Sequence, residues 1–181
     1  MKKNKQVGLI VVFAVLVLVL IVMIASCRSS GSSSSSSSGQ SNDTAQTKTY
    51  GPGETWTVDG QWSLTIDSVT ATDERNAYSD KNPAQVVVVT YSYNNLGYTS
   101  DVQDLYFGDG DFKVLDAGNA VASSYPGNIT TYAQATPVGA SCNGAQACYG
   151  LDNASDQITL TVSQYDSNHK KQEASFVLPV Q

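Results

Sequence analysis

Five aspartates in the middle of the chain form the densest group of side chains that could do chemistry: Asp101, Asp104, Asp109, Asp111 and Asp116. In the run Gly108-Asp109-Gly110-Asp111, two carboxylates leave a glycine-rich turn, and carboxylate oxygens are the ligands that calcium prefers. The spacing lacks the Asp-x-Asp-x-Asp-Gly loop and distant glutamate of an EF-hand. Asp109 and Asp111 are therefore candidate metal ligands, while a solvated loop explains the same residues without a metal.

Catalysis has little support in the pattern of side chains. The one histidine, His169, lies in the polar run Asn168-His169-Lys170-Lys171. A serine hydrolase needs a histidine base, and the two adjacent lysines disfavour an imidazolium. Two carboxylates can hydrolyse a glycosidic bond only at a defined separation, which closeness in the sequence does not establish. We therefore expect no enzyme, no catalytic residue and no cofactor.

Aromatic residues offer a different chemistry, because the chain has ten tyrosines and two tryptophans. Trp56 and Trp62 fall on expected strands and are interpreted as core residues. Four tyrosines lie in irregular segments where exposure is expected: Tyr98, Tyr106, Tyr125 and Tyr132. Rings with a polar tip are frequent in binding surfaces. These four are candidates for contact with a glycan or a peptide.

The third group is a cysteine pair, Cys142 and Cys148, with Asn143-Gly144 between them. In an oxidising compartment this spacing predicts a local disulfide across a turn. Such a bond stabilises by about 2 kcal/mol in the chain-entropy model. A redox or metal site is disfavoured, because the pair lacks Cys-x-x-Cys spacing and His169 lies far along the chain.

The N-terminus supplies the remaining cysteine, Cys27. Three lysines precede an uncharged apolar run, residues 7–24, and Ile24-Ala25-Ser26-Cys27 then reads as a lipobox. This pattern predicts a lipoprotein signal peptide, with lipidation and cleavage at Cys27. The apolar run would also reach about 27 Å as a helix, so an uncleaved single-pass transmembrane anchor is the alternative. Both interpretations place the rest of the chain on the outer face of the cell membrane.

Charge and composition agree with export. All 16 acidic residues follow Cys27, whereas three of the ten basic residues precede it. Such a surface repels nucleic acid, which we exclude as a partner. Residues 28–49 are rich in serine, with an unbroken run from Ser32 to Ser38, and predict a flexible, disordered linker. The expected organisation is a signal or anchor in residues 1–27, this linker, and one folded domain in residues 50–181.

Alternation with a period of two dominates the folded domain. It predicts strands at residues 55–58, 62–69, 112–115, 158–162 and 174–178, separated by turn residues. The β-branched and aromatic run at residues 86–93 predicts a central strand of the sandwich. The segments 98–110 and 125–139 do not alternate cleanly. Short strands without a convincing helix predict an all-β, immunoglobulin-like antiparallel β-sandwich, preceded by the N-terminal apolar helix and the disordered linker.

A family resemblance rests on four features in this order: Gly53-Glu54-Thr55-Trp56, a valine-rich strand ending at Asn94, Asp111-Phe112-Lys113-Val114-Leu115-Asp116 with Gly118, and Pro137-Val138-Gly139. Over roughly residues 50–180 the chain resembles a bacterial lipoprotein domain family of unknown function. Its members are similar to immunoprotective extracellular antigens with an immunoglobulin-like fold and are common in Gram-positive bacteria. The Cys142/Cys148 segment and the stretch around Tyr106 depart from this pattern. The resemblance implies a fold and a location, and it supplies no catalytic residues.

These observations predict a membrane-tethered, extracellular cell-surface module that binds a partner without catalysis. Beyond the membrane itself, the expected partner is an unknown envelope component, protein or host ligand. The alternative is a metal-dependent envelope accessory factor or enzyme built on the acidic cluster from Asp101 to Asp116.

Overall fold

The computed structural model describes residues 48–181. The predictions for the signal peptide or anchor, for lipidation of Cys27 and for residues 28–47 of the linker therefore lie outside the described residues. The elements are β1 (Thr49–Tyr50), β2 (Thr55–Val58), β3 (Trp62–Thr72), β4 (Gln85–Asn95), η1 (Asp109–Asp111), β5 (Phe112–Leu115), β6 (Ser123–Ser124), β7 (Ser141–Leu151), β8 (Gln157–Tyr165) and β9 (Lys171–Pro179). Among residues 48–181, no helix is long and apolar enough to cross a bilayer.

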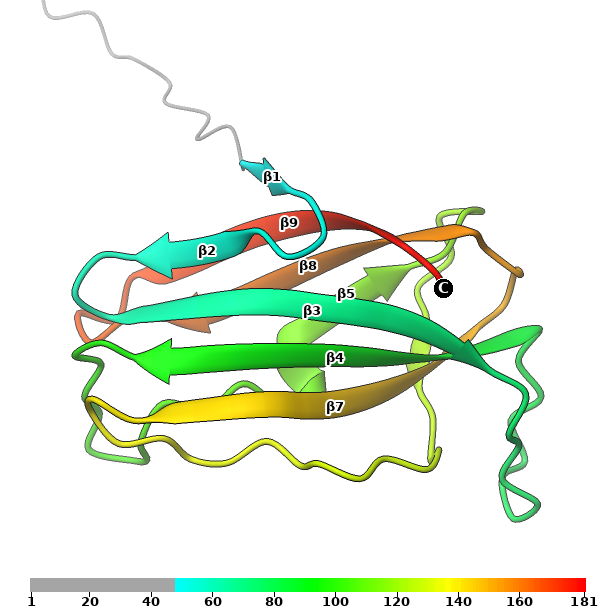
Figure 1. Ribbon diagram of the computed structural model, residues 1–181, viewed down its shortest axis with the longest axis horizontal. Helices are drawn as coiled ribbons and strands as arrows, with labels where there is room; N and C mark the ends of the chain where they lie inside the picture. Colours follow the sequence, from blue (N-terminus) through cyan, green and yellow to red (C-terminus); the bar gives the residue numbers. More distant parts are fainter. Residues whose placement is uncertain (1–47) are drawn as a thin grey trace, which may run out of the picture. The chain divides into compact units, whose positions relative to one another are not determined.

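The strands form two sheets packed as a sandwich, which confirms the all-β prediction. One sheet has the order β1-β9-β8-β5 and the other the order β2-β3-β4-β7-β6. Figure 1 shows β3, β4 and β7 side by side in one layer and β8 and β9 in the other. Neighbouring strands are antiparallel except β1, which runs parallel to β9.

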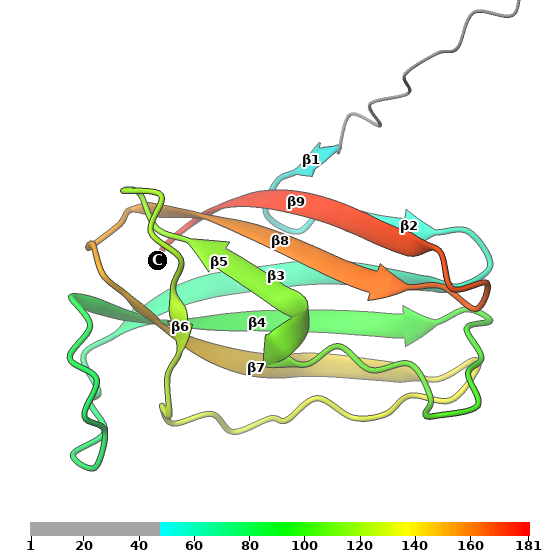
Figure 2. The same ribbon diagram turned by 180° about the vertical axis from the view of Figure 1, so that it is seen from behind.

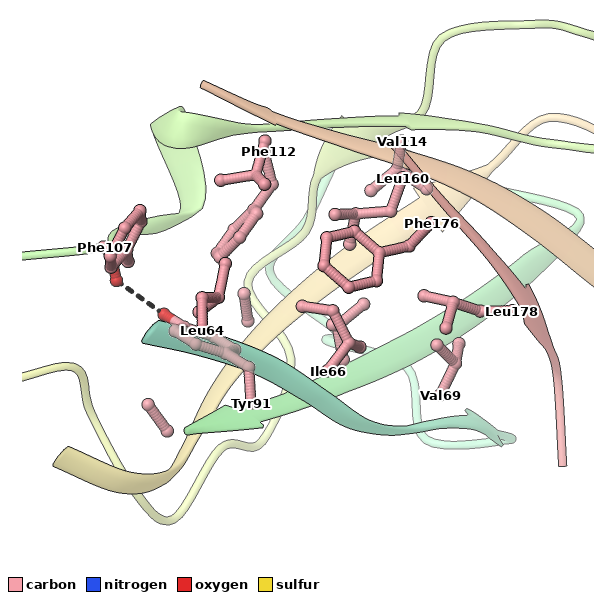
Figure 3. Packing of buried hydrophobic residues seen from close by; sticks show 14 of the residues in the cluster. Leu64, Ile66, Val69, Tyr91, Phe107, Phe112, Val114, Leu160, Phe176 and Leu178 are labelled. Carbon is pink, nitrogen blue, oxygen red and sulfur yellow. Dashed lines mark hydrogen bonds between the residues drawn. The ribbon is translucent and has the colours of Figure 1, made fainter. Parts of the chain in front are cut away.

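The core lies between the sheets and follows from the alternation of apolar residues. On β3, Leu64 and Ile66 point inward, and a bulge after Ile66 shifts the register so that Val69 is the next buried side chain. Opposite them, Phe176 and Leu178 of β9 are also buried (Figure 3). Burying one such side chain stabilises the fold by about 1.5–3 kcal/mol. Trp56 and Trp62 are buried too, as predicted.

β4 is covered on both faces, which explains its continuous run of apolar residues. Val87 and Val89 face the core between the sheets. Val86 instead packs on the outer face with Tyr125 and Cys148. A strand buried on both sides needs no alternation.

The disulfide prediction is wrong, because Cys142 and Cys148 are both free, buried thiols on one strand, β7. Six residues of extended chain span about 20 Å, whereas a disulfide requires Cα atoms within about 7 Å. Asn143 and Gly144 do not form a hairpin turn. They form a bulge opposite Ser92, between the pairs Tyr91–Ala145 and Tyr93–Cys142, with Gly144 at a φ of 65°. The bulge turns the two thiols to opposite faces, since Cys142 belongs to the core and Cys148 to the cluster on the outer face.

Candidate functional site: a tyrosine pocket at the edge of β7

Three of the four candidate tyrosines line one pocket of about 500 Å³, together with the candidate metal ligand Asp109. These are Tyr106, Tyr125 and Tyr132, and the buried Tyr91 also reaches the pocket wall. We call this cavity the tyrosine pocket. Its tyrosines and Asp109 lie apart in the sequence, and folding brings them together.

The first wall of the pocket is a loop that stands away from the sheet. β6 pairs with β7 only near the end of β7, at Tyr149 and Gly150. The segment that follows β6 then runs along the edge of β7 (Figure 2). The N–H of Tyr125 donates to the carbonyl of Cys148 at 2.9 Å, and the N–H of Gln146 donates to the carbonyl of Thr131 at 2.9 Å. Six residues of the segment thus cover a distance that two residues of β7 cover. Residues 126–130 must therefore bulge outward.

The second wall is the chain from the end of β4 to η1. Three side chains of the sheets donate hydrogen bonds to backbone carbonyls of this wall. The hydroxyl of Tyr91 donates to Phe107 at 2.8 Å (Figure 3), and that of Tyr149 donates to Asp109 at 2.9 Å. The Nε2 of Gln164 donates to the carbonyl of Tyr106 at 3.0 Å. Strands of both sheets therefore determine where this wall stands.

A hydrogen bond joins the two walls. The Oγ of Ser124 donates to the Oδ2 of Asp109 at 2.8 Å, which places the carboxylate at the boundary of the pocket. The hydroxyl of Tyr125 accepts the N–H of Asn76 at 2.9 Å, so its own proton is available to another acceptor. The ring of Tyr132 is mostly exposed.

The electrostatic character of the pocket is acidic. Its lining residues include Asp109 but no lysine, arginine or histidine. Burial raises the pKa of Tyr149, and the adjacent Asp109 and Asp111 raise it further. Burial likewise raises the pKa of Asp111, which the N–H donated by Gly108 lowers in part and the negative charge of Asp109 raises.

Cys148 lines the pocket as a thiol. Burial raises its pKa, while the N–H of Gly127 and the charge of Arg75 act in the opposite direction. A raised pKa keeps sulfur protonated near neutral pH, and the thiol is a poor nucleophile compared with the thiolate. His169 lines a different pocket, with Tyr98 and Asp101, so it offers Cys148 no base.

The acidic cluster does not converge. Among residues 48–181, no group of three or more His, Cys, Asp or Glu side chains is arranged to hold a metal ion. The Oδ2 of Asp111 accepts the N–H of Gly108 at 2.7 Å. Asp116 is buried elsewhere, and Asp101 lines the pocket of His169. Metal binding by Asp109 and Asp111 therefore stays a prediction, because among residues 48–181 no third His, Cys, Asp or Glu side chain joins these two carboxylates.

The fold resembles those of two Bacillus subtilis proteins. The first is the candidate lipoprotein ycdA, known from a crystal structure. The two structures superpose with a TM-score of 0.47 and 17% sequence identity, and the match covers 64% of this chain and 36% of ycdA. The second is the yjhA protein, with a TM-score of 0.46 and 14% identity, covering 73% of this chain and 99% of that one. The present chain thus matches about a third of the length of ycdA. No family model and no curated protein sequence matches it.

Asn76, Ser124 and Gln146 line the pocket but were not among the predicted site residues, and Cys148 was predicted as a disulfide partner instead. These residue types carry no distinctive motif. The signal that could have found them is the irregular segment 125–139, because a long unpaired segment beside a strand edge often carries a binding site. Tyr98 lies outside the pocket and packs edge-on against Trp62.

Proposed function

We propose that this protein is a cell-surface binding module, tethered to the outer face of the membrane by its N-terminus, which binds a ligand in the tyrosine pocket without catalysing a reaction. The observation that carries the proposal is the convergence of Tyr106, Tyr125 and Tyr132 with one carboxylate on a single cavity. Sites for small molecules combine apolar and aromatic walls with a few placed polar groups, and typically measure about 300–1,000 Å³.

The order of strands supports an immunoglobulin-like sandwich. β3-β4-β7-β6 corresponds to strands A-B-E-D of a constant-type immunoglobulin domain, and β5-β8-β9 corresponds to C-F-G. β2 extends the first sheet beyond β3, and β1 extends the second beyond β9. Connections at the ends and edges of such sandwiches commonly carry binding sites, and the pocket lies among connections of this kind.

A binding role without catalysis is supported by what faces the pocket. Covalent catalysis needs an activated nucleophile within hydrogen-bond reach of a base. Cys148 is a buried thiol with a raised pKa, and the one histidine of the chain lines a different pocket. The tyrosine rings and Asp109 can hold a ligand but do not constitute such a pair.

The site can be tested by capture of envelope material on the immobilised full-length protein. Tyr132 and Tyr165 are similarly exposed, at 64% and 57%, but only Tyr132 lines the tyrosine pocket. We expect Tyr132→Ala to lose the captured ligand and Tyr165→Ala to keep it. Equal capture by both variants would contradict a binding site at this pocket.

The tether can be tested independently at Cys27. If Cys27 is lipidated, metabolic labelling with a fatty acid should mark the wild type, and Cys27→Ala should accumulate as an unlabelled precursor. A wild type without label and of unchanged size would favour the transmembrane anchor.

A further inference from the structure

We propose that the tyrosine pocket recognises an organic cation, whose trimethylammonium group lies against the exposed tyrosine rings and faces the carboxylate of Asp109. This inference rests on the proposed function, because it names the ligand class of the same pocket. An anionic ligand would find no cationic side chain among the lining residues, and a glycan, which could use Asn76 and Gln146, is the competing ligand that the experiments below distinguish from a cation.

The first argument is charge. The pocket has a carboxylate at its boundary and no cationic side chain among its lining residues. Two cations stand beside the lining: the Nζ of Lys81 donates to the carbonyl of Ser124 at 2.8 Å, and the charge of Arg75 acts on Cys148. The described residues 48–181 as a whole carry six Lys or Arg against fifteen Asp or Glu and are therefore net negative. The net charge favours a cation over an anion at long range, and Asp109 is the charged side chain that lines the pocket itself.

The second argument is the number of aromatic faces. Four tyrosines line the cavity, two of which, Tyr91 and Tyr125, are buried, and the face of an aromatic ring carries the negative end of a quadrupole. Tyr132 is largely exposed and Tyr106 is partly exposed, so both rings are accessible to a ligand. A cation within about 6 Å of a ring centroid is attracted to that face, and aromatic enclosures are the usual receptors of quaternary ammonium groups.

The third argument is the apolar part of the lining. Ile129, Ala133 and Ala147 offer methyl groups, and Pro126 offers ring carbons. N-methyl groups pack well against such a surface, whereas a bare ammonium would lose three hydrogen bonds to water there. A methylated ammonium therefore fits the lining better than a primary amine.

The test measures the binding of choline to the full-length chain in a non-ionic detergent by isothermal titration calorimetry. The comparison probe is 3,3-dimethylbutan-1-ol (dimethylbutanol below), the neutral analogue of choline in which a carbon atom replaces the nitrogen. We expect choline to bind at least about tenfold more tightly, because only choline gains from the ring faces and from Asp109. Equal affinities, or no binding of choline, would overturn the inference.

Asp109→Asn isolates the charge. The asparagine oxygen can still accept the hydrogen bond from Ser124, and the backbone carbonyl still accepts the hydroxyl of Tyr149. We expect choline to bind about tenfold more weakly to this variant, with the affinity for dimethylbutanol unchanged. Asp104→Asn removes the same charge from an exposed residue outside the pocket lining and should leave both affinities unchanged.

Tyr132 isolates the aromatic contribution. Tyr132→Phe keeps the ring and should bind choline like the wild type, while Tyr132→Leu should lose about threefold in affinity. Equal choline affinity of the leucine variant and the wild type would contradict a ring contact. Because Tyr132 is exposed, both variants should fold, and their circular dichroism spectra check this.

Two further probes separate the sources and the competing ligand class. Glycerophosphocholine presents the same cation as a lipid headgroup does. We expect it to bind more weakly than choline, because its phosphate would be repelled by the carboxylate of Asp109. Tighter binding of glycerophosphocholine than of choline would show that the natural ligand is a lipid headgroup. Binding of N-acetylglucosamine in place of choline would overturn the cation while leaving the binding module intact. Envelope capture that does not depend on Tyr132 would instead overturn the module.

Discussion

At the scale of single residues, Gly127 shows how tightly the outer wall of the pocket approaches β7. A Cβ atom at Gly127 would collide with the Sγ of Cys148, a buried atom of the outer-face cluster. The N–H of Gly127 also donates to the carbonyl of Tyr125 at 2.8 Å. The N–H of Tyr125 in turn donates to the carbonyl of Cys148, so the loop cannot move away from β7 without stretching that hydrogen bond.

Gly127→Ala should lower the free energy of unfolding by about 1–3 kcal/mol, because overpacking forces the loop or the thiol to shift. Urea denaturation measures the loss. Gly110→Ala is the matched control, since a Cβ atom at Gly110 would have no neighbour within 4 Å, and it should be nearly neutral. In the background of Cys148→Ala, which removes the colliding sulfur, Gly127→Ala should cost much less. An equal cost in both backgrounds would show that the contact is not the cause.

The two thiols of β7 give a second prediction at this scale. Because the extended strand separates Cys142 and Cys148, the denatured chain should react with iodoacetamide at both residues without a reducing agent. Peptide mapping by mass spectrometry identifies the modified residues. A peptide pair joined between Cys142 and Cys148 would contradict a continuous β7.

At the scale of elements, the turn between β5 and β6 is organised by one buried carboxylate. The Oδ1 of Asp116 accepts the N–H groups of Gly118 and Ala120 at 2.8 and 2.9 Å. Its Oδ2 accepts the backbone N–H and the Nδ2 of Asn153 at 2.9 and 2.8 Å. Asp116 therefore ties this turn to the connection between β7 and β8, and its role is structural.

Stability should depend on pH through Asp116. Burial alone would raise its pKa, but the hydrogen bonds from Asn153, Ala120 and Gly118 outweigh burial and lower the pKa below its ordinary value. The folded state therefore binds this proton less readily than the unfolded state. The stabilisation is fully present above about pH 4, the usual range of an aspartate, and is lost as the pH falls through the lowered pKa.

Asp116→Asn should remove this component, so that its unfolding free energy falls less steeply than that of the wild type between about pH 5 and pH 2. At neutral pH the variant should be less stable by about 1–3 kcal/mol, because its amide would face the donors of Asn153. Urea midpoints across the pH range measure both effects. Asp104→Asn, at an exposed position, serves as the control, and an identical pH profile in the Asp116 variant would contradict the argument.

β7 is the one long strand that the sequence pattern did not predict, and the two-residue strands β1 and β6 were not predicted either. Its residues include Asn143, Gly144, Ala145 and Ala147, which have low strand propensity. Its place in the sheet follows from packing instead. Ala145 pairs with Tyr91 across the two strands, and small residues on β7 leave room for the large rings of β4. Strand propensity reflects the average surroundings of a residue type. In β7, packing against the neighbouring strand β4 determined the conformation instead.

At the scale of the whole molecule, the described residues contain their own core. The buried side chains of both sheets pack into one main cluster, and a smaller cluster lies under the segment after β6. β1 contributes to this unit, because Tyr50 pairs with β9 and its ring stacks on Phe176 with centroids 5.1 Å apart. β1 begins at Thr49, next to the predicted domain boundary.

We therefore expect residues 48–181 to fold as an independent unit, with a β-type circular dichroism spectrum and the same urea midpoint as the full-length chain in detergent. A shorter chain that begins at residue 52 should be less stable, because it lacks the pairing of β1 and the ring of Tyr50. Fluorescence of the buried Trp56 and Trp62 follows the unfolding of both chains. A strongly helical spectrum, or failure of residues 48–181 to fold, would contradict this expectation.

Much of the framework was predictable from local pattern. Alternation and turn residues predicted β2 and β5 at their observed bounds and located β3, β8 and β9 to within a few residues at each end, while the β-branched and aromatic run located β4. This works because a strand with one buried face imposes a period of two on its own residues. The aromatic core positions Trp56 and Trp62 followed from the same pattern.

By itself the sequence determined an all-β chain and a set of four tyrosines and two aspartates with chemical promise. Only the tertiary structure decided that Tyr106, Tyr125, Tyr132 and Asp109 share a cavity and that Tyr98 does not. It also decided that the cysteines lie on opposite faces of one strand. The physical reason is that strand pairing, bulges and loop closure join residues far apart in the chain, and no local period encodes those contacts.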